Sequence, residues 1–258
     1  MAWTRTYDEP EPQRVNRWLA QSGVCSRREA EGLIEQGLVS IDGETVTDAG
    51  RKIQPGQTLV LADAAQAKIE GGLTVILHKP VGVVSAQPDP GQVPAIRLLT
   101  RAALEGESPM IPGRDTRLAP VGRLDMDSRG LLLLSDDGVM AKAVIGPTSE
   151  LDKEYVVKVA GQITEAKLAK LRHGLSLDGR QLRPAQVRVS GEQTLRFILK
   201  EGRNRQIRRM CDLVELKVVD LFRLRIGPLK LGDLRQGRWR VLTAEERAAL
   251  IKAGGAGR

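Results

Sequence analysis

The chain has 258 residues, an apolar content of 41% and a net charge of +8, which suits a globular protein with a polyanionic partner such as nucleic acid. No run of apolar residues approaches the length of a transmembrane helix, and the acidic N-terminus lacks the apolar core of a secretory signal. The cysteines are Cys25 and Cys211 and the histidines are His78 and His173, so we expect no disulfide framework, no metal site and a reducing, cytoplasmic location.

The first part of the chain predicts two short helices followed by strands. Apolar residues recur at helical spacing from Val15 to Leu19, and Gly23 stands where this helix should end. Ser26 and Glu29 have the spacing of a capping box, which predicts the start of a second helix. Alternating apolar and polar residues then predict short strands, so this part should form one small module.

The two predicted helices carry four arginines with no acidic residue between positions 13 and 28: Arg14, Arg17, Arg27 and Arg28. Two short helices cannot bury four guanidinium groups, so these side chains must face solvent or a partner. A solvated helical face accounts for the charge as well as a nucleic-acid contact does.

The remainder of the chain predicts strands and helices in mixed order. Residues 74–77 and 131–134 are apolar runs typical of buried strands. Between them, residues 87–119 are rich in proline, glycine and charge, which predicts a long surface excursion with a short helix at 96–104. Because no regular βαβ repeat is present, the fold class should be α+β.

Asp125 stands directly behind Arg123-Leu124, in a loop that leads into the apolar run 131–134. An ionised carboxylate placed beside a buried strand is costly to desolvate unless a cation pairs with it. The segment 200–210 is rich in arginine and supplies possible partners. An isolated aspartate in such a loop most often caps a turn, so the residue taken alone does not define a site.

Residues 204–216 predict a helix with one apolar and one cationic face, at about 100° per residue. The apolar face carries Ile207, Met210, Cys211 and Val214. The cationic face carries Arg205, Arg208 and Arg209. Asp212 could neutralise Arg208 or Arg209, but one acid cannot pair with all three, so we expect this face to point at a ligand or an active site.

Five motifs resemble those of the RsuA-type pseudouridine synthases, and they occur in the same order. The motifs are Leu77-x-Lys79-Pro80-x-Gly82, Gly122-Arg123-Leu124-Asp125 with the run from Ser128 to Gly138, Lys153-Glu154-Tyr155, Glu201 to Met210, and Gly237-x-Trp239-Arg240-x-Leu242. Residues 13–61 resemble the S4 RNA-binding domain, which places the chain with the RluF/RluB-like branch of the family. The excursion at 87–119 departs from the family pattern because it is long.

This resemblance implies a small S4-type RNA-binding domain followed by a pseudouridine synthase catalytic domain, whose central, largely antiparallel sheet is flanked by helices. The expected divisions are a flexible tail (1–12), the S4-like domain (13–62), a linker (63–72), the catalytic domain (73–250) and a second flexible tail (251–258).

The resemblance also implies that the chain isomerises a specific uridine to pseudouridine in ribosomal RNA, that of the large subunit more than the small. Asp125 would act as nucleophile or base without a cofactor, and one of Arg203 and Arg208 should reach it. Tyr155 would stack on the target base. The basic residues expected to contact RNA are Arg123, Arg14, Arg17, Arg27, Arg28, Lys79, Arg205 and Arg209. We expect a monomer that binds no membrane.

Two other functions compete with this interpretation. A glycoside hydrolase could use Asp125 and Asp127, but side chains two residues apart on an extended segment point to opposite faces. A non-catalytic S4-type RNA-binding or ribosome assembly protein would share the charge and the basic module. An acidic residue among the cations favours an enzyme, because a protein that only binds phosphates has no need of a carboxylate there.

Overall fold

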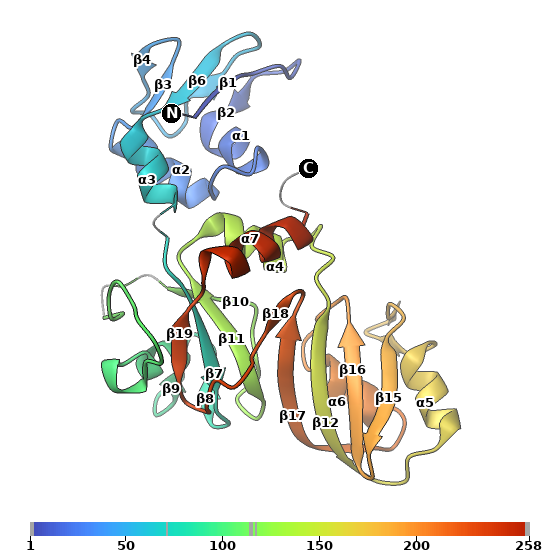
Figure 1. Ribbon diagram of the computed structural model, residues 1–258. Coiled ribbons are helices and arrows are strands. Elements are labelled where there is room, and N and C mark those ends of the chain that lie inside the picture. Colours follow the sequence, from blue (N-terminus) through green and yellow to red (C-terminus); the bar gives the residue numbers. More distant parts are fainter. Residues whose placement is uncertain (1–2, 71, 114–115, 117, 256–258) are drawn as a thin grey trace.

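Two domains make up the part of the chain that the computed structural model describes, which is residues 3–70, 72–113, 116 and 118–255 (Figure 1). The smaller, N-terminal domain lies above the larger one in this view. Its elements are β1 (Thr4–Thr6), β2 (Gln13–Arg14), α1 (Val15–Gln21), α2 (Arg27–Glu35), β3 (Val39–Ile41), β4 (Glu44–Thr45), β5 (Lys52–Ile53), β6 (Thr58–Leu61) and α3 (Asp63–Glu70).

The smaller domain follows the local sequence signals closely. Gly23 has a φ of +76° and follows α1, and α2 begins at the predicted capping box, in which the Ser26 hydroxyl accepts from the Glu29 amide and the Glu29 carboxylate accepts from the Ser26 amide. The apolar faces of both helices, including Trp18 and Ile34, pack with a four-stranded sheet of order β1-β6-β3-β4. This domain therefore has a hydrophobic core of its own.

The predicted N-terminal tail is wrong for residues 4–7. Strand β1 pairs antiparallel with β6, and Tyr7 is buried with the edge of its ring against Trp18. All three side chains of β1 are exposed, so backbone hydrogen bonds hold this edge strand, and no apolar pattern marks it in the sequence. Residues 1–2 lie outside the described part of the chain.

The expected linker and the expected C-terminal tail also contain ordered helix. Helix α3 fills most of the 63–72 segment, and Ala65 is buried in the core of the smaller domain. Small residues are typical of linkers, but alanine is also the strongest helix former. Helix α7 (Ala244–Ala253) extends into the 251–258 segment, and Gly254 packs against the backbone of Ala143. Residues 71 and 256–258 lie outside the described part.

The larger domain is built on one sheet, whose strand order is β15-β16-β12-β17-β11-β7-β19. Strands β10 and β18 pair with β11 and β17, and every pairing in this sheet is antiparallel except β11 with β17. The predicted α+β class with a largely antiparallel sheet is therefore confirmed. The elements are β7 (Thr74–Lys79), β8 (Val83–Val84), β9 (Val93–Pro94), β10 (Ala119–Val121), β11 (Arg129–Ser135), α4 (Gly138–Ile145), β12 (Lys153–Ala160), α5 (Glu165–Arg172), β13 (Ser176–Leu177), β14 (Arg180–Gln181), β15 (Gln186–Gly191), β16 (Thr194–Leu199), α6 (Gln206–Asp212), β17 (Lys217–Ile226), β18 (Leu229–Lys230), β19 (Trp239–Val241) and α7.

Strand β11 is buried on both faces, which explains its unbroken run of four leucines. Leu132 and Leu134 belong to the core that includes residues of α5 and α6, whereas Leu131 and Leu133 belong to the core beneath α4 and α7. A strand covered on both sides has no solvent-facing positions and therefore no polar alternation. Residues 122–128, which precede this strand, are consequently attached to a strand that is buried on both faces.

The 87–119 excursion packs more closely than its composition suggested. Two short 3-10 helices, Ala95–Leu98 and Arg101–Ala103, replace the predicted helix at 96–104. The indole of Trp239 donates to the carbonyl of Thr100, and Ala95 and Leu99 are buried in the main core. Residues 114–115 and 117 of this segment lie outside the described part of the chain.

The two domains contact each other through α1 and α2 of the smaller domain and α4 of the larger one. A Glu29 carboxylate oxygen, besides its role in the capping box, accepts from the amide of Gly138 at 3.2 Å, and the Lys142 ammonium donates to the carbonyl of Ala20 at 2.7 Å. A Cβ atom at Gly138 would lie 2.2 Å from the Cβ of Ser26, so only glycine permits this close approach.

No helix in the described part of the chain is long and apolar enough to cross a bilayer.

Candidate active site

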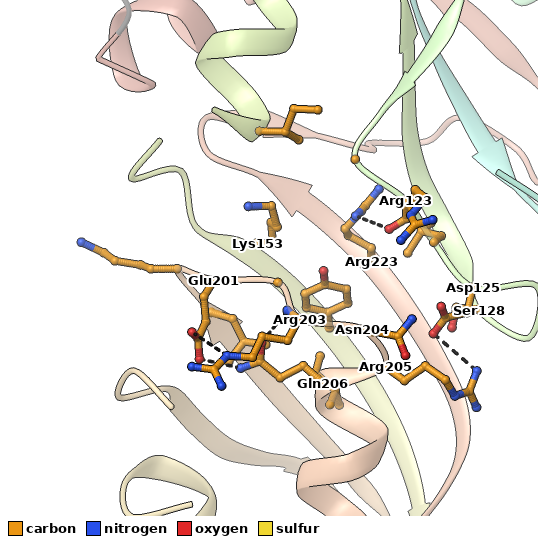
Figure 2. Close-up of a pocket in the computed structure, with 18 of the residues that line it drawn as sticks. Arg123, Asp125, Ser128, Lys153, Glu201, Arg203, Asn204, Arg205, Gln206 and Arg223 are labelled. Carbon is orange, nitrogen blue, oxygen red and sulfur yellow. Dashed lines mark hydrogen bonds and ion pairs between the residues drawn. The ribbon is translucent and has the colours of Figure 1, made fainter. Parts of the chain in front are cut away.

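A cleft of about 700 Å³ lies between the loop of residues 122–128, strand β12 and the segment 199–208 (Figure 2). The predicted site residues that line it are Arg123, Asp125, Tyr155, Arg203, Arg205 and Arg208. These residues come from three regions that are far apart in the sequence, so the fold brings the predicted catalytic residues together. Lys79 and Arg209 do not line the cleft, and neither do the arginines of the smaller domain.

The Asp125 loop (residues 122–128) is fixed to its surroundings by backbone contacts. Gly122 turns the chain with a φ of +81°, and the Ser85 hydroxyl donates to the Leu124 carbonyl and accepts from the Leu124 amide, at 2.6 and 2.9 Å. The amide of Gly82 donates to the carbonyl of Met126 at 2.8 Å. The side chain of Asp125 therefore projects from a constrained loop, and it keeps 34% of its surface exposed in the cleft.

Lys79 lies in the interior near this loop, and the prediction that it contacts RNA is wrong. Its side chain is fully buried, and its ammonium donates to the carbonyls of Pro80 and Val83 at 2.9 and 2.7 Å. Burial lowers the pKa of Lys79 to about 8, although the charges of Asp125 and Asp127 act in the opposite direction. The motif position indicated a basic residue near the site, but strand β7 directs it into the interior.

Arg205 is the arginine that reaches Asp125. Its Nη1 lies 3.5 Å from Asp125 Oδ2, while Nη1 and Nη2 also bind the two carboxylate oxygens of Asp127 at 3.2 and 2.9 Å. The prediction that Arg203 or Arg208 would pair with Asp125 is therefore wrong. Arg205 precedes α6 in a left-handed conformation (φ 47°, ψ 33°), so the helical geometry used for the prediction does not apply to it. This strained backbone aims the guanidinium at the loop.

Asp127 anchors the cations around Asp125. Burial raises the pKa of Asp127, but the hydrogen bond from Arg205 and the charges of Arg208 and Arg205 outweigh this effect and hold it below its usual value. Asp125 and Asp127 both reach Arg205 because the segment between them is a turn, whereas the sequence predicted an extended segment with opposed side chains. The described residues contain no group of three or more potential ligands placed to hold a metal ion.

Arg208 fixes the Asp125 loop rather than pairing with Asp125 itself. Its side chain is 12% exposed, and its Nη2 donates to the carbonyl of Asp127 at 2.8 Å and to the Ser128 hydroxyl at 3.3 Å. The same nitrogen lies 3.3 Å from a carboxylate oxygen of Asp127. The helical spacing predicted Asp212 as its partner, but Arg208 forms its ion pair with Asp127 of the Asp125 loop. Arg208 is therefore a positioning residue in this geometry.

Arg203 and Arg209 bind the hairpin of β13 and β14. Arg203 donates from Nη1 to the Leu177 carbonyl and from Nη2 to the Gln181 carbonyl, both at 3.0 Å. Arg209 forms a two-pronged ion pair with Asp178, at 2.6 and 3.0 Å. Arg203 still lines the cleft, but Arg209 is engaged away from it, which does not support the predicted RNA contact of Arg209.

Tyr155 lies on the floor of the cleft between two cations. It is 9% exposed, and it pairs in the sheet with Arg223 of β17, directly across from it. Lys153 precedes it by two residues on β12 and lines the same cleft. Sequence reasoning identified Tyr155 and quoted Lys153 only as part of its motif. It missed Arg223, because no local pattern predicts which residue of a distant strand lies opposite Tyr155.

The arginines of the smaller domain are exposed as expected. The side chains of Arg14, Arg17, Arg27 and Arg28 face solvent, and none forms an ion pair with a described acidic residue. These four residues stand at the start of α1 and α2, on the outside of the domain core. We refer to these four exposed arginines together as the α1–α2 basic surface.

Comparisons with known proteins agree with this arrangement. The family model described as RNA pseudouridylate synthase matches residues 73–213, and the S4 domain model matches residues 13–59. The chain is 36% identical to the ribosomal large subunit pseudouridine synthase B of Bacillus subtilis, over 91% of this chain and 93% of that protein. It is 32% identical to the dual-specificity RNA pseudouridine synthase RluF of Escherichia coli K12, over 93% of this chain and 78% of that protein. A crystal structure of a pseudouridylate synthase superposes with a TM-score of 0.63 and 26% identity, over 92% of this chain and 99% of the other.

Proposed function

This chain belongs to the RNA pseudouridine synthase family, and from this membership we propose that it acts on a uridine of large-subunit ribosomal RNA with Asp125 as the catalytic carboxylate. The chain is thus an isomerase that changes the connection between base and sugar. The N1–C1′ bond of uridine breaks, the uracil turns, and C5 bonds to C1′, while a hydrogen leaves C5 and N1 gains one. Mass is unchanged by this reaction.

The contact between Arg205 and Asp125 carries the proposal for the catalytic residue. A carboxylate that acts as a nucleophile or base needs a defined position, and the guanidinium of Arg205, 3.5 Å away, gives Asp125 an ionic partner in the cleft. Ser85 and Arg208 hold the backbone around Asp125, so the carboxylate presents a defined position to a bound nucleotide. Among the residues that line the cleft, which include Tyr155, this acid is the one that projects from the constrained loop.

The target uridine must leave its stack to reach a carboxylate inside a cleft, at a cost of a few kcal/mol. Tyr155 offers an aromatic surface on the floor of the cleft for the extruded uracil. Arg123 is exposed and lines the cleft on the same loop as Asp125, so its guanidinium is available for the vacated position or for neighbouring phosphates. The α1–α2 basic surface would bind a further part of the folded RNA.

Ribosomal RNA as the substrate rests on the relatives and on the organisation of the chain. A protein 36% identical over most of the chain is named for the large ribosomal subunit, and the chain combines an S4 domain with a net charge of +8. To test this proposal, the main ribosomal RNA of the large subunit and the ribosomal RNA of the small subunit would be transcribed without modification and incubated separately with the protein. We expect pseudouridine in the large-subunit RNA, and its formation only in the small-subunit RNA would refute the assignment.

Asp125→Asn tests the catalytic assignment. The variant should bind ribosomal RNA with nearly unchanged affinity and form no pseudouridine, scored by carbodiimide-dependent stops of reverse transcription. Asp212→Asn is the matched control, because it removes one carboxylate from an exposed position of α6 that forms no ion pair with a described residue. Pseudouridine formation by Asp125→Asn at the rate of the Asp212→Asn control would show that another group performs the reaction.

A further inference from the structure

Two cations of the cleft take no part in the contact between Asp125 and Arg205. Lys153 is half-buried on β12, and Arg223 on β17 is 2% exposed, and both line the cleft. Figure 2 shows the two side chains on neighbouring strands at the wall of the cleft, with the guanidinium of Arg223 turned toward Arg123. Two cations at one site are typical of a site that binds an anion.

The sheet places both cations beside Tyr155. Arg223 pairs with Tyr155 across the β12–β17 ladder, and Lys153 is two residues before Tyr155 on β12. On its other side Arg223 pairs with Gly130 of β11, where a Cβ atom would lie 2.3 Å from the Arg223 carbonyl oxygen. Glycine at this position therefore lets β11 and β17 approach closely around the arginine. Arg223 is fixed at the centre of the sheet, next to the ring that would hold the base.

Neither cation is neutralised by the described part of the protein. Arg223 donates from Nε to the Leu131 carbonyl at 2.8 Å and from Nη1 to the Arg123 carbonyl at 3.3 Å, and its Nη2 has no hydrogen-bond partner. Lys153 donates only to the carbonyl of Leu151, at 3.3 Å. No described carboxylate lies within ion-pair distance of either group.

Arg225, two residues further along β17, differs from Arg223 because acidic side chains of the protein pair with it. It is bound by both Asp152 and Glu154, which neutralise it. Two positive charges that act on each other in a partly buried cleft are costly unless an anion compensates them. The effect is visible at Lys153: burial and the charge of Arg223 lower its pKa, and together they outweigh the opposite effect of the Asp152 carboxylate.

We propose that Lys153 and Arg223 form a subsite for the backbone phosphate next to the target uridine, which rests on the proposed function. An RNA backbone brings a phosphate with every nucleotide, whereas the carbonyl groups of uracil are neutral and do not compensate two charges. Guanidinium and ammonium groups are the usual ligands of phosphate in proteins. With the phosphate held here, the uracil lies on Tyr155 and the sugar–base unit faces Asp125, so the subsite orients the nucleotide for the reaction.

The test compares a nucleotide with its nucleoside. Uridine 5′-monophosphate, uridine 3′-monophosphate and uridine are titrated into the full-length protein at millimolar concentrations, and binding is followed by ³¹P and ¹H NMR line shapes. We expect at least one monophosphate to bind more tightly than uridine. Lys153→Met and Arg223→Lys should each lower the affinity for that monophosphate by about tenfold and leave the affinity for uridine unchanged. Lys158→Met, at an exposed position of the same strand, is the matched control and should change neither.

Three outcomes would overturn the subsite. In the first, the wild-type protein binds uridine and both monophosphates with equal affinity. In the second, the variants lose affinity for uridine and for the monophosphate to the same extent, and in the third, neither variant changes the affinity for the monophosphate. Lys153→Met removes a half-exposed side chain with a single long hydrogen bond, so it remains informative if Arg223→Lys does not fold. Because binding requires no turnover, a protein that holds the phosphate but forms no pseudouridine would refute the proposed function and leave the subsite intact.

Discussion

Arg205 contacts Asp125 from a position that Asp127 holds in place. The guanidinium binds both oxygens of Asp127 at 2.9 and 3.2 Å and approaches Asp125 at 3.5 Å, so the structural partner of the arginine is the neighbouring acid. Asp127 is held in turn by Arg208, and its pKa remains below the usual value despite burial. This arrangement keeps a cation beside Asp125 while leaving the carboxylate of Asp125 open to the cleft.

Arg205→Gly should separate the role of this cation from its effect on folding. Glycine adopts the left-handed backbone of position 205 without strain, so the free energy of unfolding should stay within about 1 kcal/mol of the wild type. The rate of tritium release from ribosomal RNA labelled at uridine C5 should fall by about 100-fold, which is typical of the removal of an electrostatic group. Arg205→Lys should also be slow, because an ammonium cannot bind two acids as a planar fork does. A glycine variant with the wild-type rate would show that Arg205 is dispensable.

Lys79→Met should change how stability depends on pH. The folded-state pKa of Lys79 is lowered to about 8, whereas the unfolded chain keeps the ordinary value of about 10.4. Between these values the unfolded chain binds more protons, so the free energy of unfolding rises with pH in this window. The substitution should remove this rise in the free energy of unfolding, which is at most about 3 kcal/mol. Urea unfolding below pH 8 and near pH 10 would measure it. Lys158→Met should retain the rise, and an identical pH slope in Lys79→Met and the wild type would contradict the assignment.

Gly138→Ala should separate the two domains without unfolding either. A new Cβ would lie 2.2 Å from Ser26 Cβ and 2.3 Å from Glu29 Oε2, so α2 must move away from α4. Small-angle X-ray scattering should report a larger radius of gyration, and activity on ribosomal RNA should fall more than activity on a short hairpin. Gly32→Ala in α2 is the control, since its new Cβ comes no closer than 3.9 Å to any atom outside the backbone of its own helix. Unchanged scattering in the Gly138 variant would show that the contact does not set the domain arrangement.

Arg28→Ala should weaken RNA binding through the α1–α2 basic surface. For every phosphate that the protein no longer neutralises, the slope of log K against log salt becomes shallower by about 0.7 to 0.9. Titrations of ribosomal RNA at several salt concentrations should therefore give a smaller slope, and affinity should fall most at low salt. Arg188→Ala, at an exposed position of β15 that does not line the cleft, should leave the slope unchanged. An equal slope of log K against log salt for both variants and the wild type would show that Arg28 does not contact RNA phosphates.

Local signals in the sequence predicted the elements that depend only on nearby residues. The capping box of Ser26 and Glu29 marks the start of α2, because its hydrogen bonds close within one turn. Ile207, Met210, Cys211 and Val214 are buried on one face, as their spacing predicted, although α6 itself spans only Gln206–Asp212. The leucines of β11 are buried because both faces of that strand are covered. Edge strand β1 escaped prediction, since backbone pairing leaves no apolar pattern.

The sequence by itself determined which residue types enter the site: an aspartate in the 122–128 loop, a tyrosine after Lys153, and a cluster of arginines at 203–209. Only the tertiary structure decided which arginine reaches Asp125, that Lys79 is buried and that Arg223 lies opposite Tyr155. The physical reason is distance along the chain. Arg205 and Asp127 are 78 residues apart, and their contact depends on strand register and on one left-handed residue, neither of which helical or strand periodicity encodes.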